Sequence, residues 1–405
     1  NPATWFTHDN EGYNTYPTYL EAQAAKQLPT DKAPHLLAPL TLANGQEVQT
    51  RVALAPLTRG RSGPTRVPND IMVEYYAARA ENTGIVITEA TTIDDEHSNG
   101  WKDSAGIYTA DQAAGWKKVV DAVHAKGAKI VVQLWHMGRA AHDSYLEGRQ
   151  VVSASAEVIN GANFGSDGVH AADESKQPYQ TPRALTVDEI AHIVDNYRKA
   201  TELAVEAGFD GVEIHSANGY LLNQFLDPNS NKRTDNYGGS VENRSRFLNE
   251  VLDAVSTVLP ANRIAVRLSP NGVYNDMGHA ESIETYTYLF SELSKRGLMY
   301  LHVMDGLTFG FHKKSEVFTI ANVRKVYGAG VIMCNVGYDR DTGDKVIADG
   351  HADLVAYGRP FIGNPDLVYR YAHDVPLSES NPATWFTHDN EGYNTYPTYL
   401  EAQAA

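Results

Sequence analysis

The chain has 405 residues, of which 42% are hydrophobic and 21% are charged, as expected of a globular protein with a sizeable core. Asp and Glu outnumber Lys and Arg by 50 to 34, so the formal net charge is -16 at pH 7. This acidic balance argues against nucleic acid or an anionic membrane as a partner.

The single cysteine, Cys334, excludes internal disulfides and cysteine-based zinc or iron–sulfur sites. It lies in an apolar run, where we expect a small buried hydrophobic residue. The sequence shows no secretory signal pattern and no run of about 20 apolar residues. We therefore expect a cytoplasmic protein.

The two ends of the chain carry an exact repeat, because residues 1–25 recur unchanged as residues 381–405. A solenoid repeat would be approximate and would run through the whole chain. One perfect copy at each end indicates an engineered change, such as a permutation or a tail duplication, with a very recent natural duplication as the alternative. The second copy continues from the last predicted strand–helix unit, so residues 26–405 are expected to form one domain. Residues 1–25 are expected to be displaced or docked on a neighbouring molecule.

A hairpin is predicted first, at Asn44 and Gly45, where it would close the bottom of a barrel. Eight short apolar runs follow, with helical patterns between them. They are residues 51–57, 84–90, 129–136, 211–217, 263–270, 299–306, 330–336 and 354–360. Continuous apolar runs are typical of parallel strands buried on both faces. Eight strand–helix units favour a closed (β/α)8 barrel, a TIM barrel, over an open doubly wound sheet, which stays as the alternative.

Capping boxes predict helix starts at residues 109–112 and 186–189, and the second helix is expected to end at Gly208. Residues 138–183 follow strand three. This segment is rich in Gly, Ser and Asn and is too long for an ordinary loop. We expect it to form a lid over the carboxyl ends of the strands.

Catalytic groups of such barrels gather at the carboxyl ends of the strands. After strands seven and eight, Gly337, Gly358 and Arg359 match the phosphate site that barrels form there. No GxGxxG follows the first strand and no P-loop is present, so the sequence offers no Rossmann or ATP fingerprint.

The other strand ends carry polar side chains within apolar surroundings, namely Thr58, Gln133, His215, Asn218, Tyr220 and Arg267. Buried amide and guanidinium groups need polar partners. Together they fit a phosphorylated planar ring with hydrogen-bonding edges. Taken singly, a capping role for Thr58, a structural role for His215 and a salt bridge for Arg267 stay open. A metal site is disfavoured, because no third ligand stands at useful spacing.

Seven motifs resemble the Old Yellow Enzyme family, the flavin-dependent ene-reductases. They are APLTR at 55–59, TEA at 88–90, VQLWHMGR at 132–139, EIHSANGYLLNQF at 213–225, TDNYGGSVENR at 234–244, GRPFIGNPDL at 358–367 and EGYNTYPTY at 391–399. The resemblance runs from about residue 33 to residue 399. It implies non-covalent FMN, NAD(P)H as reductant, and small enones, enals or nitroalkenes as substrates.

The resemblance also implies how the flavin is held. Thr58 is expected to hydrogen-bond flavin O4, Gln133 to meet the pyrimidine edge, and Arg267 to lie by N1 and O2, where charge accumulates on reduction. The other expected cofactor contacts come from Pro56, Leu57, Ala90, His215, Asn218, Gly337, Gly358 and Arg359.

For the substrate, the resemblance implies that His215 and Asn218 bind the carbonyl or nitro oxygen and that Tyr220 protonates Cα. Trp101, Trp135 and Phe386 are expected to line the pocket. The implied cycle is ping-pong: NAD(P)H reduces FMN and leaves, then the alkene receives hydride at Cβ and a proton on the opposite face.

The chain departs from the family pattern at several positions. Trp101 replaces a common Tyr and should narrow the pocket, and Phe386 removes a hydroxyl. Asn218 places the chain with the His/Asn members, and Thr58 argues against the subclass tuned by a thiol. Two rivals remain, a non-redox lyase or isomerase acting on a phosphorylated substrate and a flavin sensor without turnover. The duplicated segment offers a route to self-association.

Overall fold

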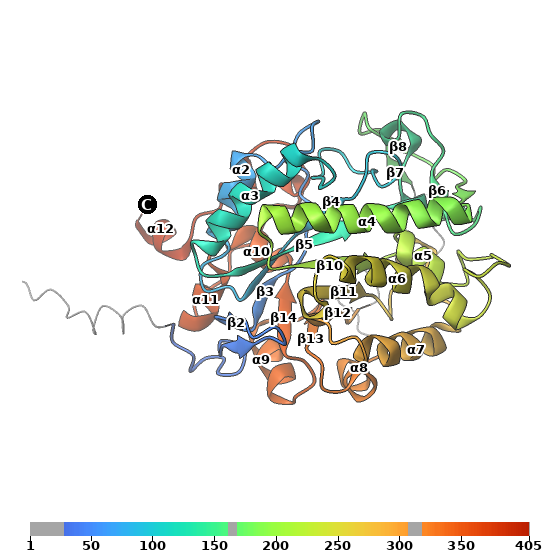
Figure 1. Ribbon diagram of the computed structural model, residues 1–405. Coiled ribbons are helices and arrows are strands. Elements are labelled where there is room, and N and C mark those ends of the chain that lie inside the picture. Colours follow the sequence, from blue (N-terminus) through green and yellow to red (C-terminus); the bar gives the residue numbers. More distant parts are fainter. Residues whose placement is uncertain (1–27, 161–167, 307–317, 405) are drawn as a thin grey trace, which may run out of the picture.

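The computed structural model describes residues 28–160, 168–306 and 318–404. Eight parallel strands close into one barrel, in the order β10-β11-β12-β13-β14-β3-β4-β5 (Figure 1). The strands are β3 (Val52–Leu54), β4 (Ile85–Thr92), β5 (Lys129–Trp135), β10 (Gly211–Ser216), β11 (Ile264–Leu268), β12 (Tyr300–Met304), β13 (Ile332–Asn335) and β14 (Leu354–Tyr357). The pairing of β5 with β10 closes the ring. The predicted barrel is confirmed and the open sheet is excluded.

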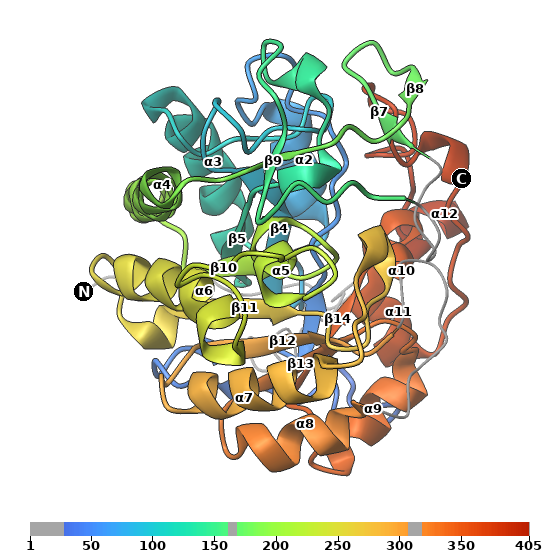
Figure 2. The same ribbon diagram turned by 90° about the vertical axis from the view of Figure 1, so that its right-hand side faces the viewer.

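Helices surround the barrel, and Figure 2 looks onto the carboxyl ends of the strands inside this ring. They are α2 (Asp70–Ala78), α3 (Ala110–His124), α4 (Val187–Ala207), α5 (Leu221–Leu226), α6 (Val241–Ser256), α7 (Ser282–Ser294), α8 (Ile320–Tyr327), α9 (Arg340–Ala348), α10 (Arg359–Gly363), α11 (Leu367–His373) and α12 (Tyr399–Ala404). Short 3₁₀ helices lie at Gly138–Ala140, Asp143–Tyr145, Ala261–Arg263, Tyr274–Asp276 and Pro382–Thr384.

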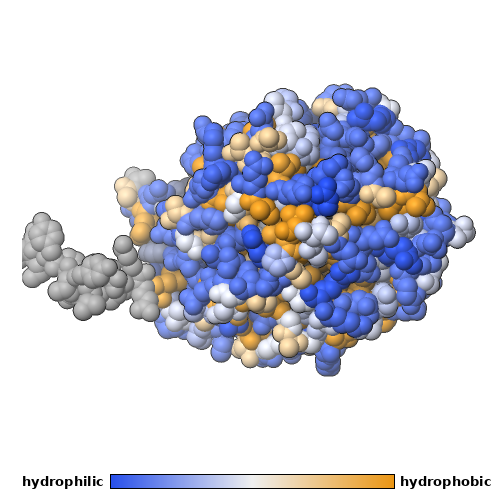
Figure 3. All heavy atoms as spheres, viewed as in Figure 1, coloured by the Kyte–Doolittle hydropathy of each residue, from blue (hydrophilic) through white to orange (hydrophobic). Residues whose placement is uncertain are grey.

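The helix starts follow the predicted local chemistry. Thr109 and Thr186 each form a complete capping box, with Gln112 and Glu189 respectively. Helix α4 ends at Gly208, whose φ of 89° is left-handed and suits glycine. The outward helix faces are largely hydrophilic, as Figure 3 shows for one side of the molecule. Within the described ranges, no helix is long and apolar enough to cross a membrane.

The barrel interior is closed at the bottom by the hairpin of β1 (Leu40–Thr41) and β2 (Glu47–Val48). Gly45 turns this hairpin with a φ of 80°. Leu42 and Val48 are buried against inward-facing strand residues such as Ile87 and Met333. The predicted plug is therefore present. Cys334 of β13 is a free, buried thiol, as expected.

The long insertion after β5 contains two small sheets. β6 (Val152–Ser153) pairs with β9 (Arg183–Ala184), and β7 (Val169–His170) pairs with β8 (Lys176–Gln177). The β7–β8 hairpin lies near the C-terminal part of the chain (Figure 2). Glu174 of this hairpin lies 2.6 Å from Lys102 Nζ and 2.8 Å from His388 Nε2. The insertion thus reaches over the strand ends, as expected of a lid.

The C-terminal copy of the duplicated segment packs against the barrel through buried arginines. The Arg61 guanidinium donates to the backbone carbonyls of Thr384, Trp385, Asp389 and Glu391. Arg59 adds bonds to the carbonyls of the same segment. The ring of Tyr393 stacks on Tyr75 with 4.1 Å between centroids. The first copy, residues 1–25, lies outside the described residues.

Candidate functional site

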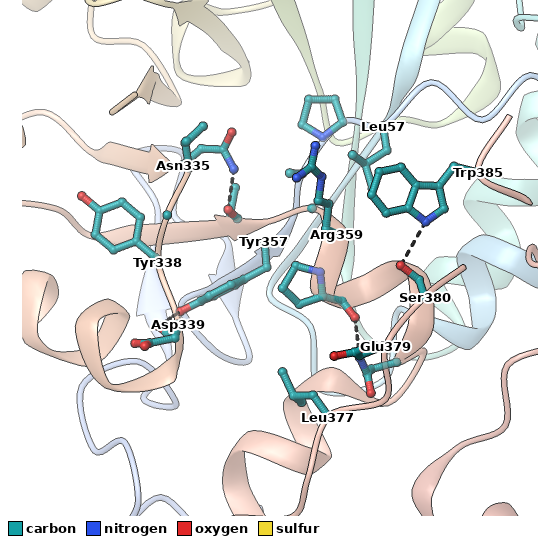
Figure 4. Close-up of a pocket in the computed structure, with 18 of the residues that line it drawn as sticks. Leu57, Asn335, Tyr338, Asp339, Tyr357, Arg359, Leu377, Glu379, Ser380 and Trp385 are labelled. Atoms are coloured by element: carbon teal, nitrogen blue, oxygen red, sulfur yellow. Dashed lines mark hydrogen bonds between the residues drawn. The ribbon is translucent and has the colours of Figure 1, made fainter. Parts of the chain in front are cut away.

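Two cavities lie at the carboxyl ends of the strands. The first has a volume of about 860 Å³ and is lined from β3, β11, β13, β14 and the C-terminal segment (Figure 4). The second has a volume of about 440 Å³ and is lined by the lid, the loop after β4 and the C-terminal segment. Trp385 lines the first cavity and Phe386 the second, so this segment forms part of both walls.

One end of the first cavity is formed by the loops after β13 and β14, where the sequence predicts a phosphate site. Val336 and Gly337 have φ values of 78° and 76°. Positive φ is rare for a β-branched residue such as Val336 and marks a backbone held in a strained shape. Arg359 is exposed, and its guanidinium lies 5.0 Å from the centre of the Trp385 ring. Figure 4 shows both side chains at the cavity.

The inner end of the first cavity carries a buried positive charge. Arg267 of β11 donates from Nη2 to Asn335 Oδ1 at 3.1 Å, and its Nε has no partner among the described residues. Asn335 is held in turn by its bond to the carbonyl of Ala356 (Figure 4). Burial lowers the pKa of Arg267 from its usual value, but an arginine stays charged at ordinary pH. A buried charge with an open donor fits an anionic or strongly polar ring edge.

The structure brings together part of the predicted cofactor set. Its members that line the first cavity are Pro56, Leu57, Arg267, Gly337, Gly358 and Arg359. The members that lie outside that lining are Thr58, Ala90, Gln133, His215 and Asn218. Strand pairing still places most of these on one rim, since Ala90 is opposite Gln133 and His215 is opposite Arg267. Thr58 lies in the loop after β3, beyond Leu57, and is half-buried.

These features fit FMN. The cavity combines a strained glycine-containing loop and an Arg at one end with a buried cation at the other. Its walls include Pro56, Leu57 and Trp385, which suit the faces of a flat ring. The open Nε donor of Arg267 suits a ring edge that gains negative charge.

His215 is fixed as a hydrogen-bond donor. Its Nδ1 accepts from the backbone N–H of Ala217 at 3.3 Å, so Nε2 carries the proton in the neutral ring. Burial, together with the nearby Arg267, holds the pKa of His215 well below its usual value. The ring is therefore neutral at physiological pH, with one N–H available.

Asn218 lies next to this donor in a constrained backbone. Its φ of 60° is left-handed, and Ser269 and Asn275 bind its backbone N–H and carbonyl. Its side-chain Nδ2 is buried and has no partner in the described part of the chain. A buried amide donor left unpaired costs stability, so it is consistent with a ligand oxygen at this position.

Tyr220 connects these donors to the second cavity, which it lines. Its ring is perpendicular to His215 at 5.0 Å and to Trp135 at 5.1 Å between centroids. Burial raises the pKa of the Tyr220 phenol, so the phenol keeps its proton across the usual pH range. Trp135 positions Tyr220 but lies outside the cavity lining.

The outer wall of the second cavity is aromatic. Trp101 and Phe386 meet edge to face with 5.4 Å between centroids, and Phe386 is 51% exposed. Tyr179 of the lid and Tyr274 complete the wall. Sequence reasoning missed these two tyrosines, because they come from loops whose approach to the strand ends no local pattern predicts.

Sequence reasoning also missed Asn335, Glu213 and His302. Each lies in a strand that its apolar run predicts, and Glu213 stands two residues before His215 on β10. Because alternate strand residues face the same side, the position of His215 would have predicted an inward-facing carboxylate at Glu213.

Comparison with known proteins places the chain among flavin oxidoreductases. A model of the "NADH:flavin oxidoreductase / NADH oxidase family" matches residues 35–378. A putative 12-oxophytodienoate reductase 4 from Oryza sativa subsp. japonica is 41% identical over 381 residues, covering 93% of this chain and 95% of the relative. A probable flavin mononucleotide-dependent alkene reductase from Leishmania infantum is 40% identical over 363 residues, covering 89% of this chain and 97% of the relative.

Solved structures agree in fold. Morphinone reductase in complex with tetrahydroNAD superposes with a TM-score of 0.83 at 41% identity, covering 90% of this chain and 98% of that chain. The Old Yellow Enzyme homologue from Zymomonas mobilis gives a TM-score of 0.84 at 38% identity, covering 90% of this chain and 99% of that chain. The resemblance seen in the motifs is confirmed: the chain belongs to the NADH:flavin oxidoreductase family that includes the Old Yellow Enzymes, and it is an FMN-dependent oxidoreductase.

Proposed function

We propose that this FMN-dependent ene-reductase reduces the C=C bond of α,β-unsaturated carbonyl or nitro compounds, in a ping-pong cycle with NAD(P)H. The observation that carries the proposal is the group formed by His215, Asn218 and Tyr220. His215 lies on β10, the strand next to that of Arg267, and Asn218 and Tyr220 follow in the turn after it. Two hydrogen-bond donors are thus placed near one protonated phenol, and Tyr220 lines the second cavity. The relative from Leishmania infantum is itself described as an alkene reductase.

In this proposal FMN, when bound in the first cavity, supplies hydride transfer from the nicotinamide to the alkene. Nε2 of His215 and Nδ2 of Asn218 bind the substrate oxygen and stabilise the negative charge that develops on it. One such donor typically contributes about 10²–10³ in rate. Tyr220 gives its proton to Cα.

We further propose that Arg267 and Gln133 hold the ring edge, that Thr58 bonds flavin O4, and that Gly337 and Arg359 hold the phosphate. The remaining proposed ring contacts are Pro56, Leu57, Ala90 and Gly358. Their place on one rim of the barrel supports this set. Trp101 and Phe386 form the wall of the substrate pocket, and the perpendicular Trp135 ring orients Tyr220.

Steady-state turnover of the FMN-loaded protein tests the substrate class. We expect NAD(P)H oxidation without oxygen only when 2-cyclohexenone is added, with cyclohexanone as the product and parallel double-reciprocal lines. If the enone does not stimulate NAD(P)H oxidation, the result would favour the alternative in which the protein is a flavin-binding sensor without turnover. A chain that binds no FMN would favour the phosphate-dependent lyase or isomerase.

We also propose that residues 1–25 duplicate the native tail and lead to self-association by competing for the surface that holds residues 381–404. The sequence identity of the two copies supports this, together with the sequence-independent bonds from Arg59 and Arg61 to backbone carbonyls. Removing residues 1–25 should leave FMN binding intact and lower the associated fraction measured by light scattering. Loss of FMN binding would show that the first copy is the working one. For the cell compartment we propose the cytoplasm.

A further inference from the structure

A layer of polar side chains follows the apolar part of the barrel interior, and one of its members, Arg267, lines the first cavity. Gln133 of β5, Glu213 of β10, Arg267 of β11 and His302 of β12 form it on four successive strands of the ring. In register, Gln133 lies opposite Glu213, and Arg267 lies opposite His302. All four are buried, with Glu213 and His302 fully inaccessible. Two residues earlier on the same strands the interior is apolar, with Val131 before Gln133 and Ala265 before Arg267.

Glu213 is the centre of this layer. Its Oε1 accepts from Gln133 Nε2 at 2.7 Å, and its Oε2 lies 2.9 Å from His302 Nδ1. Burial opposes ionisation of Glu213, but His302, Arg267 and Gln133 outweigh it, and the pKa of Glu213 lies below its usual value. Burial lowers the pKa of His302, so its neutral ring donates from Nδ1 to the carboxylate. Glu213 is thus a buried carboxylate with two donors.

The carboxylate fixes the orientation of the Gln133 amide. With Nε2 bound to Glu213, the Oε1 atom and the second N–H of Gln133 remain for a ligand. If the amide were flipped, two acceptor oxygens would face each other at hydrogen-bond distance. An acceptor next to a donor matches the flavin pyrimidine edge, where an N–H is flanked by carbonyls. Glu213 therefore selects which face of the Gln133 amide a ring would meet.

The same carboxylate is the buried counter-charge of Arg267. Arg267 has a neutral partner in Asn335, and the electrostatic attraction of Glu213 favours its charged form. A cation beside the ring stabilises the reduced, more negative flavin, and a nearby anion offsets part of this effect. Interactions between charges are strong in a buried layer, because little water screens them.

We propose that Glu213 is a positioning residue for the flavin: it orients Gln133 and offsets the charge of Arg267, and so sets both the affinity for FMN and its reduction potential. Glu213 is not proposed to touch the reacting atoms. The inference rests on the proposed placement of Gln133 and Arg267 at the flavin ring.

The test compares FMN binding and potential in the wild type, Glu213→Gln and Glu213→Asp. Glu213→Gln removes the charge and leaves an amide that either orientation of Gln133 satisfies. We expect weaker FMN binding by fluorescence quenching. We also expect the reduction equilibrium against a reference dye to favour reduced flavin by about tenfold, or ~30 mV for a two-electron couple. Glu213→Asp keeps the charge but shortens the side chain, so FMN binding should weaken while the equilibrium constant for flavin reduction stays within about threefold of the wild-type value.

A coupling experiment separates positioning from general damage to the barrel. Gln133→Ala should weaken FMN binding in the wild type. It should have a much smaller effect in Glu213→Gln, because the Gln133 amide no longer has a fixed orientation in that variant. The exposed Glu206→Gln on α4 is the matched control and should change neither quantity.

Distinct results would overturn the two proposals. If the wild type binds no FMN, the function assigned above fails. If the wild type binds FMN but Glu213→Gln, with an unchanged melting temperature of the apoprotein, leaves affinity and potential unaltered, only the role of Glu213 fails. Should Glu213→Gln not fold, FMN affinity in Glu213→Asp equal to that of the wild type would equally contradict it.

Discussion

At the scale of single residues, burial prepares the side chains that we propose as catalytic for those roles. His215 is held neutral with its Nε2 proton in place, and Asn218 keeps a buried donor without a partner among the described residues. Tyr220 remains a protonated phenol, because burial disfavours its anion. All three follow from a single strand end and the turn after it, so small changes in β10 would affect them together.

Replacing Tyr220 by Phe tests the proton donor. The aromatic contacts with His215 and Trp135 would survive, so flavin reduction by NAD(P)H should keep its rate. The half-reaction with the alkene should slow roughly 10²-fold or more, as for loss of a general acid. Stopped-flow spectra of the two half-reactions measure both effects. An equal loss in both would remove Tyr220 from this role.

The motifs predicted His215, Asn218, Tyr220 and Arg267 at strand ends, because polar residues interrupting apolar strands are visible in the sequence. The partners of these residues were less visible. Asn335 and His302 look like ordinary strand residues until the register places them beside Arg267. Side-chain partners come from long-range pairing, which no local pattern encodes.

At the scale of elements, the loop after β3 is held between β4 and the C-terminal segment. Glu89 of β4 accepts from the backbone N–H of Gly60 at 3.3 Å, and its other oxygen has no partner among the described residues. Arg59 and Arg61 on the same loop bind the C-terminal segment. This loop therefore couples a barrel strand to the segment that supplies Trp385 and Phe386 to the two cavities.

The raised pKa of the Glu89 carboxyl predicts that the stability of the folded protein depends on pH. Burial raises the pKa of Glu89 from 4.5 to about 7, against the opposing effects of the Gly60 N–H and Arg59. Between these values the unfolded chain loses the proton and the folded chain keeps it, so this group lowers stability as the pH rises from 4.5 to 7.

Glu89→Gln should therefore stabilise the protein more at pH 8 than at pH 5, by up to about 3 kcal/mol from 1.36 kcal/mol per unit. Urea unfolding at both pH values measures the difference, and Glu206→Gln serves as an exposed control. A gain that is the same at both pH values would mean that Glu89 is ionised in the folded protein.

Most helices and strands lie where the sequence predicts them, because strong local signals define them. Two capping boxes, the Gly45 hairpin and the eight apolar runs all appear where expected. Strand ends were less accurate: β4 extends to Thr92, two residues beyond its predicted run, through an irregularity between Ile87 and Ala90. The fold of the lid was not predicted, because its short sheets depend on contacts with distant segments.

At the scale of the whole molecule, the barrel brings strand ends from across the chain to one rim. Leu57 near the start and Trp385 near the end line the same cavity (Figure 4). Although the formal net charge of the chain is -16, Arg267 and Arg359 both line this cavity, together with Asp339 and Glu379.

The visible spectrum of the purified protein tests the central claim most directly. With FMN bound, flavin absorption bands should bleach when NADPH or NADH is added without oxygen, and they should return on addition of 2-cyclohexenone. That sequence would demonstrate both half-reactions on one cofactor. A protein that stays colourless after FMN is supplied, or whose reduced flavin is not reoxidised by an enone or a nitroalkene, would contradict the account.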